Sequence, residues 1–153
     1  MSGTTETVVL CGGCFWPTQE LLRHRDGVIS TRVGYTGGEN DHPTEEDHPG
    51  HAEAVEVTFD PERLSYEDLL RYFLQMHRTD LSEEIVGEVH RSAIFCTTDE
   101  QRRTAERMIA EFDTTGIVPG KVVTDVKEAV TFWEAPAEDQ DYLERYPAGH
   151  RFF

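Results

Sequence analysis

The sequence predicts an α+β fold in which a central mixed sheet is flanked by helices. The order of the expected elements indicates it: strand, helix, strand, strand, helix, strand, helix, strand, which is typical of an antiparallel or mixed sheet. Size and composition agree, because 153 residues with 37% hydrophobic and 10% aromatic side chains suit one domain with a substantial core. There is no internal repeat and no Pro/Gly/Ser-rich linker. We therefore expect one domain over residues 1–153, with 1–6 flexible.

One helix and three strands are expected in the first half of the chain. The helix begins near Cys14, and Pro17 is compatible with it because the first turn of a helix tolerates a missing N–H. The turn signal at Gly37 ends the second strand, and the polar segment that follows is a loop. The third strand alternates, with Val55 and Val57 on one face. In order, the strand, helix, strand, loop and strand cover 7–10, 14–24, 28–35, 39–50 and 52–59.

The second half adds two longer helices, three extended segments and a short final helix. Ser65 and Asp68 resemble a capping box, and apolar residues follow them at helical spacing. The next helix is charged and amphipathic, with Met108 and Phe112 facing inward. In order, we expect a helix that starts after Ser65, a strand at 92–97, a helix at 99–112, extended segments at 122–126 and 129–132, and a helix at 138–145.

The charge balance excludes some classes of partner. Lys and Arg number 14 against 30 Asp and Glu, a formal net charge of −16. Such a surface repels phosphate backbones and anionic lipids, so we expect neither nucleic acid nor a membrane as partner. The start of the chain lacks the basic region of a secretory signal, and no apolar run is long enough to span a bilayer. With three cysteines, an odd number, we expect a cytoplasmic protein rather than a disulfide-stapled secreted domain. We also expect a monomer.

The most informative stretch reads Cys11-Gly12-Gly13-Cys14-Phe15-Trp16. It puts the Cys14 thiol on a glycine turn at a helix N-terminus, where unpaired N–H groups and the helix dipole favour the thiolate. Because the thiolate is the nucleophilic form, this position predicts redox or nucleophilic chemistry. Cys11 could close a CxxC disulfide, for which the glycines supply backbone freedom. A zinc site would need a second such pair, which the chain lacks.

Further motifs follow this stretch in a fixed order. They are Val33-Gly34-Tyr35-Thr36-Gly37-Gly38, Gly50-His51-Ala52-Glu53-Ala54-Val55, Phe59-Asp60-Pro61 and Arg91-Ser92-Ala93-Ile94-Phe95. Together with Gly13-Cys14-Phe15-Trp16, the set resembles the peptide methionine sulfoxide reductase family, A class, over about residues 8–149. Several motifs in the right order are far more specific than one alone. The resemblance implies the two-layer α+β sandwich of that family and no bound cofactor.

The resemblance also implies a role for each candidate residue. Cys14 attacks the sulfur of an S-epimer sulfoxide, and Glu53 acts as the general acid for the departing oxygen. Tyr35 hydrogen-bonds the same oxygen, while Phe15 and Trp16 hold the sulfur-bound methyl group. The products are a sulfide and a sulfenic acid on Cys14. Each residue also has a structural alternative: a buried cysteine, a solvated carboxylate, an ordinary strand tyrosine and core aromatics.

The chain departs from the family pattern where the substrate is recognised. His90 takes the position of a second active-site tyrosine, Ile85 that of a substrate-binding aspartate, and Val89 that of a glutamine. A customary Tyr-His pair is missing around Glu138-Asp139. Replacing aspartate by isoleucine removes a hydrogen-bond acceptor, and sites built around a polar contact discriminate strongly for it. We therefore predict a divergent reductase that prefers a small-molecule sulfoxide over peptide methionine sulfoxide.

The thiol that resolves the sulfenic acid is a further departure. Many family members end in Gly-Tyr-Cys, whereas this sequence has Gly149-His150-Arg151. Cys11 is the natural substitute, but it is equally well explained as the last buried residue of the first strand. In that case an external thiol reduces the sulfenic acid directly, a thioredoxin-like protein in the cell or dithiothreitol in vitro. Cys96 lies in a strand-like run, and we take it as structural.

Three rival hypotheses stay open. One is a thioredoxin-like disulfide oxidoreductase that uses Cys11 and Cys14, and another is a non-catalytic binding module of the same fold. The third is a divalent metal site at His42, His48 and His51, whose spacing matches no helical or knuckle pattern, so we expect no metal. We count His51 with the substrate-binding residues, as an orienting or structural side chain.

Overall fold

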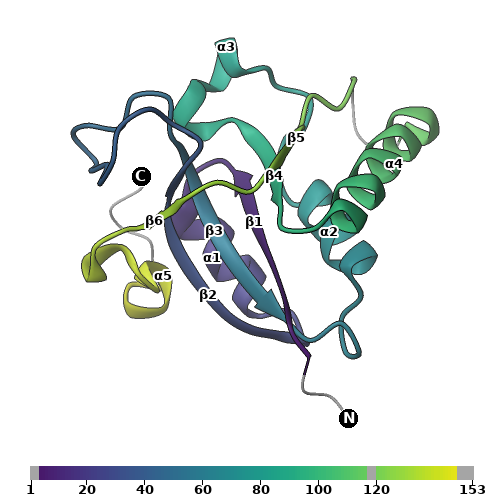
Figure 1. Ribbon diagram of the computed structural model, residues 1–153, viewed down its shortest axis with the longest axis horizontal. Helices are drawn as coiled ribbons and strands as arrows, with labels where there is room; N and C mark the ends of the chain where they lie inside the picture. The colour runs from purple at the N-terminus through teal and green to yellow at the C-terminus, as the bar shows by residue number, and fades with distance from the viewer. Residues whose placement is uncertain (1–3, 117–119, 148–153) are drawn as a thin grey trace.

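The computed structural model, which describes residues 4–116 and 120–147, contains a six-stranded sheet with helices α1, α2 and α4 packed on one face (Figure 1). The strands are β1 (Glu6–Gly12), β2 (Val28–Thr36), β3 (Ala52–Phe59), β4 (Ser92–Cys96), β5 (Asp125–Glu128) and β6 (Phe132–Glu134). The helices are α1 (Phe15–Arg23), α2 (Tyr66–Gln75), α3 (Glu83–Val86), α4 (Asp99–Thr115) and α5 (Tyr142–Arg145), with short 3-10 helices η1 (Glu88–His90) and η2 (Ala137–Asp139).

The strands lie in the order β5-β4-β1-β3-β2-β6. Every neighbouring pair is antiparallel except β4 and β5, which run parallel. The predicted α+β class with a mixed sheet is therefore confirmed. Because β3 and β4 run opposite to β1 and β2 in this order, the last residues of β1 and β2 lie beside the first residues of β3 and β4. The motif residues Gly12, Tyr35, Glu53 and Ser92 thus come to one end of the sheet.

Strand alternation divides the core between the two faces of the sheet. On β1, Val8 and Leu10 belong to the cluster beneath the helices, whereas Val9 and Cys11 belong to a smaller cluster on the opposite face. Buried apolar side chains of α1, α2 and α4 belong to the first cluster, and these helices form the second layer of the sandwich. Each large apolar side chain buried there contributes roughly 1.5–3 kcal/mol. The segment that links β5 to β6 crosses the other face and packs Ala129 against the smaller cluster, and Phe132, the first residue of β6, packs there too (Figure 1).

The two long amphipathic helices begin at capping side chains. Ser65 Oγ accepts a hydrogen bond from the backbone N–H of Asp68 at 3.1 Å, as the capping-box pattern predicts. Thr98 Oγ1 accepts one from the N–H of Gln101, also at 3.1 Å. A cap of this kind stabilises a helix by about 1 kcal/mol. The caps fix where α2 and α4 start, and so which of their faces meets the sheet.

The N-terminal prediction needs a correction at one residue. Glu6 was expected to be flexible, but it pairs with Phe59 in the antiparallel ladder between β1 and β3. Backbone hydrogen bonding in the ladder therefore extends one residue earlier than the apolar run. Residues 1–3 of the same prediction lie outside the described ranges.

The two extended segments near the C-terminus start three residues later than predicted, at Asp125 for β5 and Phe132 for β6. The reason lies in the hydrogen bonds of the residues before β5. Val122 donates its N–H to the Asp113 carboxylate at 2.7 Å, and Val123 donates to a loop carbonyl at 2.7 Å. Those residues are thus tied to α4 and a loop rather than to β4. Their apolar side chains resembled a strand, but their backbone groups are used elsewhere.

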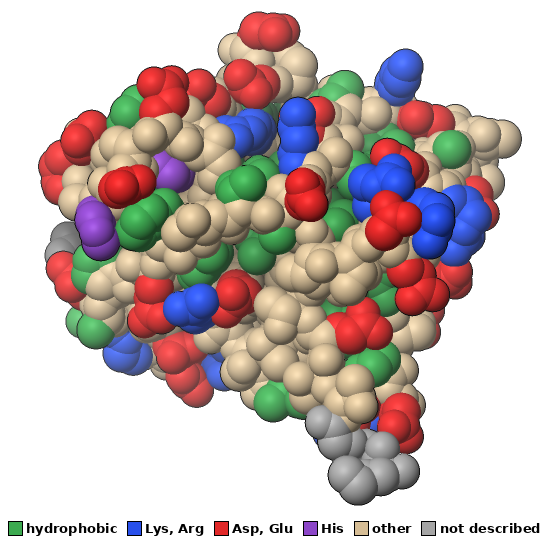
Figure 2. Space-filling model, viewed as in Figure 1, with side chains coloured by type: hydrophobic (Ala, Val, Ile, Leu, Met, Phe, Trp, Pro, Cys, Tyr) green, Lys and Arg blue, Asp and Glu red, His purple; other side chains and the backbone are tan. Residues whose placement is uncertain are grey.

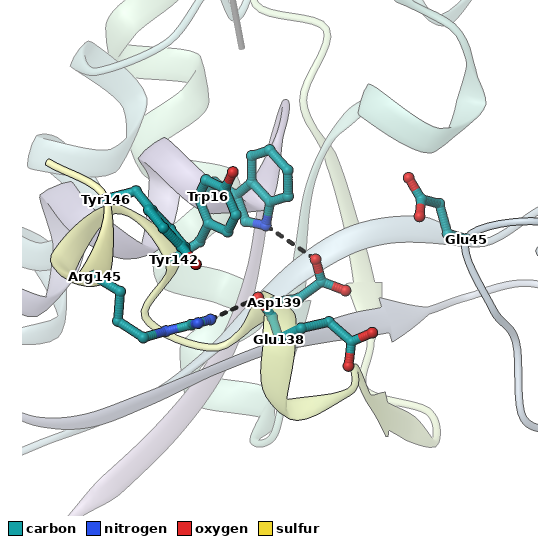
Figure 3. A pocket seen from close by; sticks show the side chains of 7 residues that line it. All are labelled: Trp16, Glu45, Glu138, Asp139, Tyr142, Arg145 and Tyr146. Atoms are coloured by element: carbon teal, nitrogen blue, oxygen red, sulfur yellow. Dashed lines mark hydrogen bonds between the residues drawn. The ribbon is translucent and has the colours of Figure 1, made fainter. Parts of the chain in front are cut away.

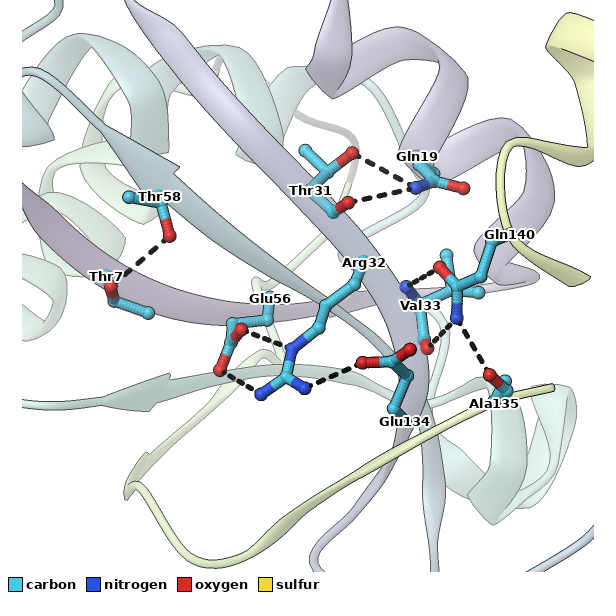
Figure 4. A network of polar contacts seen from close by, with 10 residues as sticks. All are labelled: Thr7, Gln19, Thr31, Arg32, Val33, Glu56, Thr58, Glu134, Ala135 and Gln140. Carbon is cyan, nitrogen blue, oxygen red and sulfur yellow. Dashed lines mark hydrogen bonds and ion pairs between the residues drawn. The ribbon is translucent and has the colours of Figure 1, made fainter. Parts of the chain in front are cut away.

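The predicted final helix over 138–145 is interrupted between η2 and α5 by Gln140. This residue is extended, and its side chain binds the sheet in three places (Figure 4). Its Oε1 accepts from the N–H of Val33 at 2.9 Å, and its Nε2 donates to the carbonyls of Val33 at 2.9 Å and Ala135 at 3.0 Å. A continuous helix could not make these bonds. Gln140 therefore pins η2 and α5 beside α1.

The surface is acidic, as the composition requires. Figure 2 shows acidic side chains spread over the visible face and basic side chains gathered over α4, on the right. Those arginines are paired: Arg102 lies 2.6 Å from Asp99, and Arg107 lies 3.1 Å from Glu111. Among the helices of the described ranges, none is long and apolar enough to cross a membrane.

Candidate active site

Cys14 lies where β1 turns into α1. Gly13 precedes it with a φ of +95°, a backbone conformation that L side chains rarely adopt, so the turn requires glycine. Cys14 is the N-cap residue of α1, and it is partly buried. The predicted placement of this thiol at a helix N-terminus is confirmed.

Glu53 and Tyr35 reach the same place from two neighbouring strands. They are directly opposite each other in the register of β2 and β3, so their side chains share one face of the sheet. Glu53 Oε1 accepts a hydrogen bond from the backbone N–H of Phe15 at 2.9 Å. That N–H is one of the donors left unpaired at the start of α1. The carboxyl, on a side chain that is 17% exposed, is thereby held against the helix turn that follows Cys14.

The structure corrects the prediction that Cys14 is a thiolate. Burial raises the pKa of the Cys14 thiol to about 12, and the Glu53 carboxylate beside it adds to the effect. The backbone N–H of Trp16 lowers this pKa, as expected at a helix N-terminus, but it is outweighed. Cys14 therefore holds its proton at neutral pH. Among its neighbours, Glu53 is the carboxylate with the strongest influence on that proton.

The two aromatic residues after Cys14 take different positions. Phe15 is buried, and its ring meets the edge of the Tyr35 ring with centroids 5.6 Å apart. Trp16 is partly buried and stacks on Tyr142, with ring centroids 3.8 Å apart and planes 7° from parallel. The indole N–H of Trp16 donates to Asp139 Oδ1 at 3.2 Å. The indole is thus held between α5 and η2.

A cavity of about 540 Å³ opens beside this indole, and we name it the Trp16 cavity. Its lining is aromatic and acidic (Figure 3): Trp16, Glu45, Glu138, Asp139, Tyr142, Arg145 and Tyr146. The Arg145 guanidinium is turned to backbone carbonyls, those of Ala137, Glu138 and Gln140, at 2.6–3.3 Å. Burial raises the pKa of Asp139, and its carboxylate neighbours raise it further. The lining thus has three carboxyl groups and one guanidinium, which is turned to backbone carbonyls.

Cys14 itself lines a second cavity of about 350 Å³, which we name the glycine-side cavity. Its lining comes from the turn after β1, the end of α2 and the segment that holds α3 and η1: Gly12, Gly13, Cys14, His77, Arg78, Val86 and His90. Ile85 was expected to form a substrate wall, but its side chain is 69% exposed and lies outside this lining. In the four-residue helix α3, Val86 faces the cavity instead.

His90 stands between the glycine-side cavity and Glu53. Its Nε2 lies 3.5 Å from Glu53 Oε2, and its side chain is 41% exposed. The hydrogen bond to Glu53 raises the pKa of His90 above its ordinary value of 6.5. Glu53 therefore contacts the first turn of α1 through one oxygen and His90 through the other.

His77 also lines the glycine-side cavity, and sequence reasoning missed it. Its Nδ1 lies 2.8 Å from the Phe73 carbonyl, which can only accept, so Nδ1 carries the hydrogen. Nε2 then accepts from the Ser92 hydroxyl at 2.7 Å, and Ser92 lies 2.7 Å from the Thr124 hydroxyl. Burial lowers the pKa of His77, so the ring is neutral. The sequence did offer one signal for this residue. His77 follows the buried Phe73 by four positions, which is one helical turn along the same face.

Cys11 lies apart from Cys14. It is fully buried in the cluster on the sheet face opposite the helices, and its N–H and carbonyl belong to a strand paired with β4 opposite Ala93. Burial raises the pKa of the Cys11 thiol to about 12. The two thiols of the CxxC stretch are thus not brought together. Cys96 is also buried, with its sulfur 3.8 Å from the Tyr66 hydroxyl, which fits the structural role we expected.

His51 serves the loop that precedes β3. Its ring is 1% exposed, Nδ1 accepts from the N–H of Gly38 at 3.1 Å, and Nε2 donates to the Asn40 carbonyl at 2.8 Å. Because both ring nitrogens are occupied, His51 has none left for a metal or for a substrate. Of the other two loop histidines, His48 stacks on Tyr35 with centroids 5.7 Å apart.

Comparison with known proteins identifies relatives of this arrangement. A family model described as peptide methionine sulfoxide reductase matches residues 6–152. The peptide methionine sulfoxide reductase MsrA of Nocardia farcinica is 56% identical over 149 residues, which cover 95% of this chain and 88% of the relative. The solved structure of methionine sulfoxide reductase A of Corynebacterium diphtheriae is similar with a TM-score of 0.80 and 26% identity, covering 97% of this chain and 79% of that one. Mxr1 of Saccharomyces cerevisiae, solved in complex with Trx2, has a TM-score of 0.68 and 22% identity over 93% of this chain and 87% of that one.

Proposed function

Because the chain belongs to the peptide methionine sulfoxide reductase family, A class, and reduces methionine sulfoxide with thiols, we propose that Cys14 is its nucleophile and Glu53 its general acid. The observation that carries this proposal is the position of the Glu53 carboxyl. It is held by the N–H of Phe15 at 2.9 Å, on the same helix turn as Cys14, and it influences the Cys14 proton directly. A carboxyl placed in this way can take the proton from the thiol and give it to the sulfoxide oxygen.

The first step balances without any other reactant. The Cys14 sulfur attacks the sulfoxide sulfur, and the thiol proton passes through Glu53 to the sulfoxide oxygen. The oxygen then moves to the Cys14 sulfur as the substrate sulfur leaves as a sulfide. The substrate sulfur is reduced by two electrons, and the Cys14 sulfur is oxidised by two to a sulfenic acid. The high pKa of the thiol fits this sequence, because the proton is still on sulfur when the oxygen needs it.

Tyr35 and His90 are the candidates for binding the sulfoxide oxygen together with Glu53. Tyr35 lies opposite Glu53 in the register of the sheet, and His90 Nε2 lies 3.5 Å from its carboxylate. Burial raises the pKa of Tyr35, and the hydrogen bond to Glu53 raises the pKa of His90, so both side chains are favoured in forms that donate hydrogen bonds. Phe15 and Trp16 are the candidates for holding the methyl group.

The preference for a small-molecule sulfoxide stays a prediction with less support than before. One of its reasons was an apolar wall at Ile85, but that side chain faces solvent. The other reason, histidine in place of tyrosine at position 90, remains. Steady-state kinetics with N-acetylmethionine S-sulfoxide, a peptide that contains methionine S-sulfoxide, and methyl phenyl sulfoxide test it. A higher kcat/KM for the peptide would reject the preference.

An external thiol is proposed as the reductant, with a thioredoxin-like protein in the cell. Two thiols supply the two electrons that the sulfenic acid needs, so no bound cofactor is required. Cys11 is a poor internal resolving thiol, because it lies on the opposite face of the sheet and is fully buried. The complex of Mxr1 with Trx2 indicates that a protein of this fold can receive such a partner.

The same geometry argues against a CxxC disulfide oxidoreductase, which needs Cys11 and Cys14 side by side. The test of the proposed function is sulfide production with dithiothreitol, combined with mass spectrometry of the protein after one turnover. We expect a sulfenic acid at Cys14 and no disulfide between Cys11 and Cys14. Turnover that needs Cys11, or no sulfide at all, would contradict the proposal.

A further inference from the structure

Cys14 lines the glycine-side cavity, whereas the Trp16 cavity opens beside the indole two residues later, and the linings of the two cavities differ in charge. The Trp16 cavity has three carboxylates, Glu45, Glu138 and Asp139, and its arginine is turned to backbone carbonyls. The glycine-side cavity has no carboxylate among its lining residues in the described ranges. Its ionisable side chains other than Cys14 are the bases His77, His90 and Arg78.

Charge decides which cavity suits an incoming thiolate. Opposite unit charges 4 Å apart attract by about 1–4 kcal/mol at effective dielectric constants between those of water and a protein surface, and like charges repel equally. A thiolate that approached along the three carboxylates would meet this repulsion. Along the glycine-side cavity it meets His90, whose cationic form is favoured by Glu53, and the guanidinium of Arg78. Both bases are paired with a carboxylate, Arg78 with Asp80 at 2.7 Å and His90 with Glu53 at 3.5 Å, but neither carboxylate is among the residues that line the cavity.

Access to the Cys14 sulfur is also better on the glycine side. A Cβ added to Gly13 would have no other heavy atom within 4 Å, so the space beside this residue is open. Gly12 has no side chain, and a Cβ there would meet His77 at 3.3 Å, so the cavity floor is backbone and a neutral ring. Val86 from α3 forms one wall of the cavity.

We propose that the glycine-side cavity is the entry site for the thiolate of the reductant, while the sulfoxide binds on the side of Trp16. This inference rests on the proposed sulfenic acid at Cys14. The reductant sulfur attacks the Cys14 sulfur, an S–S bond forms and the S–O bond breaks. The hydroxide leaves with a proton from the Glu53–His90 pair as water. A second thiolate then attacks the reductant sulfur, forms the reductant disulfide, and releases Cys14, which takes up a proton.

The test fills the cavity and follows the two half-reactions separately. Val86→Trp narrows the cavity, and Ile85→Trp is the matched control, since it adds the same ring one residue earlier on an exposed position. The first measurement is the sulfide formed in a single turnover without reductant. The second is the rate at which the Cys14 sulfenic acid is reduced, with dithiothreitol in one arm and a thioredoxin in the other.

With Val86→Trp we expect an unchanged single-turnover burst, to within about twofold, and reduction of the sulfenic acid slowed by about tenfold or more. If reduction is slowed with thioredoxin alone, the cavity is the entry site for a protein thiol only. If reduction is slowed in both arms, the cavity admits small thiols as well. Ile85→Trp should change neither half-reaction. Val86→Phe, a smaller change, replaces Val86→Trp if the tryptophan variant does not fold.

Two outcomes would overturn the inference. One is a burst slowed as much as the reduction, which would make the glycine-side cavity the sulfoxide site. The other is reduction at the wild-type rate in both arms, which would exclude the cavity as the route. Failure of the proposed function looks different, because the wild-type protein would then form no sulfide and no sulfenic acid at Cys14.

Discussion

Replacing Glu53 by glutamine separates its charge from its position. The amide oxygen can still accept the hydrogen bond from the Phe15 N–H, which is 2.9 Å long in the native protein, so the side chain stays in place. It can no longer carry a proton from the Cys14 thiol to the sulfoxide oxygen. General acid–base catalysis contributes about 10²–10⁴ in rate, which is about 3–5 kcal/mol of barrier at 1.36 kcal/mol per factor of ten. We expect kcat for sulfide formation to fall by that amount.

The same substitution should make the Cys14 thiol more acidic. The Glu53 carboxylate raises the pKa of that thiol, second only to burial, and the neutral amide removes this contribution. At a fixed pH of about 8, below the native pKa, a lower pKa gives more thiolate and faster alkylation. Glu53→Gln should therefore react faster with iodoacetamide while it reduces sulfoxide more slowly. A variant that had merely lost its structure would not separate the two rates in this way.

The assay measures both rates on the same preparation. Sulfide is followed with N-acetylmethionine S-sulfoxide and dithiothreitol, and alkylation is followed by mass of the peptide that contains Cys14. Glu56→Gln is the matched control, because Glu56 is on the same strand but on the other face, paired with Arg32 at 2.5 Å. It should change neither rate. Sulfide formation by Glu53→Gln within about threefold of the native rate would refute the role of Glu53 as general acid.

Three further predictions follow from other contacts. Cys11→Ala should keep full turnover with a thioredoxin as reductant and cost about 1 kcal/mol of unfolding free energy, since Cys11 is buried away from Cys14; turnover lost with thioredoxin but kept with dithiothreitol would make Cys11 the resolving thiol. The rate of sulfide formation should decline as pH rises through the raised pKa of His90, because the cation is lost there. His90→Gln should remove this decline; an unchanged pH profile of the variant would exclude a role for the His90 cation in sulfoxide reduction. Gln140→Ala should cost about 1–3 kcal/mol in urea unfolding, because it leaves the Val33 N–H and the Ala135 carbonyl without partners, while the Val33 carbonyl keeps the Ala135 N–H; it should also raise KM by freeing the wall of the Trp16 cavity.

The sheet and its long helices could be predicted because each carries its own local signal. The alternation of Val55 and Val57 gave β3 its correct bounds, and Ser65 marked the start of α2. The boundaries that were wrong depended on remote partners. Val122 is apolar like a strand residue, but its N–H belongs to the Asp113 carboxylate, nine positions earlier on another element. No periodicity within 122–126 contains that information.

In the candidate site, too, the residues could be predicted from local sequence, whereas a property that depends on packing could not. Cys14, Glu53 and Tyr35 could be named from motifs, and the register of the sheet brings their strands to one end. The charge state of Cys14 could not be derived from its place at a helix N-terminus. The helix contribution is present, but it depends on partial charges, whereas burial and a full carboxylate charge act against it. The burial of the thiol and its distance from the carboxylate depend on how β3 and α1 pack, and the sequence around Cys14 does not predict that packing.

The alternation of side chains along β1 explains why Cys11 and Cys14 lie on different sides of the sheet. In a strand, successive side chains alternate faces, so Cys11 points to the face away from the helices, with Val9. After Gly13 the chain leaves the strand and enters α1, which packs on the other face, and Cys14 goes with it. A disulfide would require the end of β1 to unpair from β4 and turn over. Here the glycine turn between β1 and α1 therefore divides the two cysteines between the two layers of the sandwich.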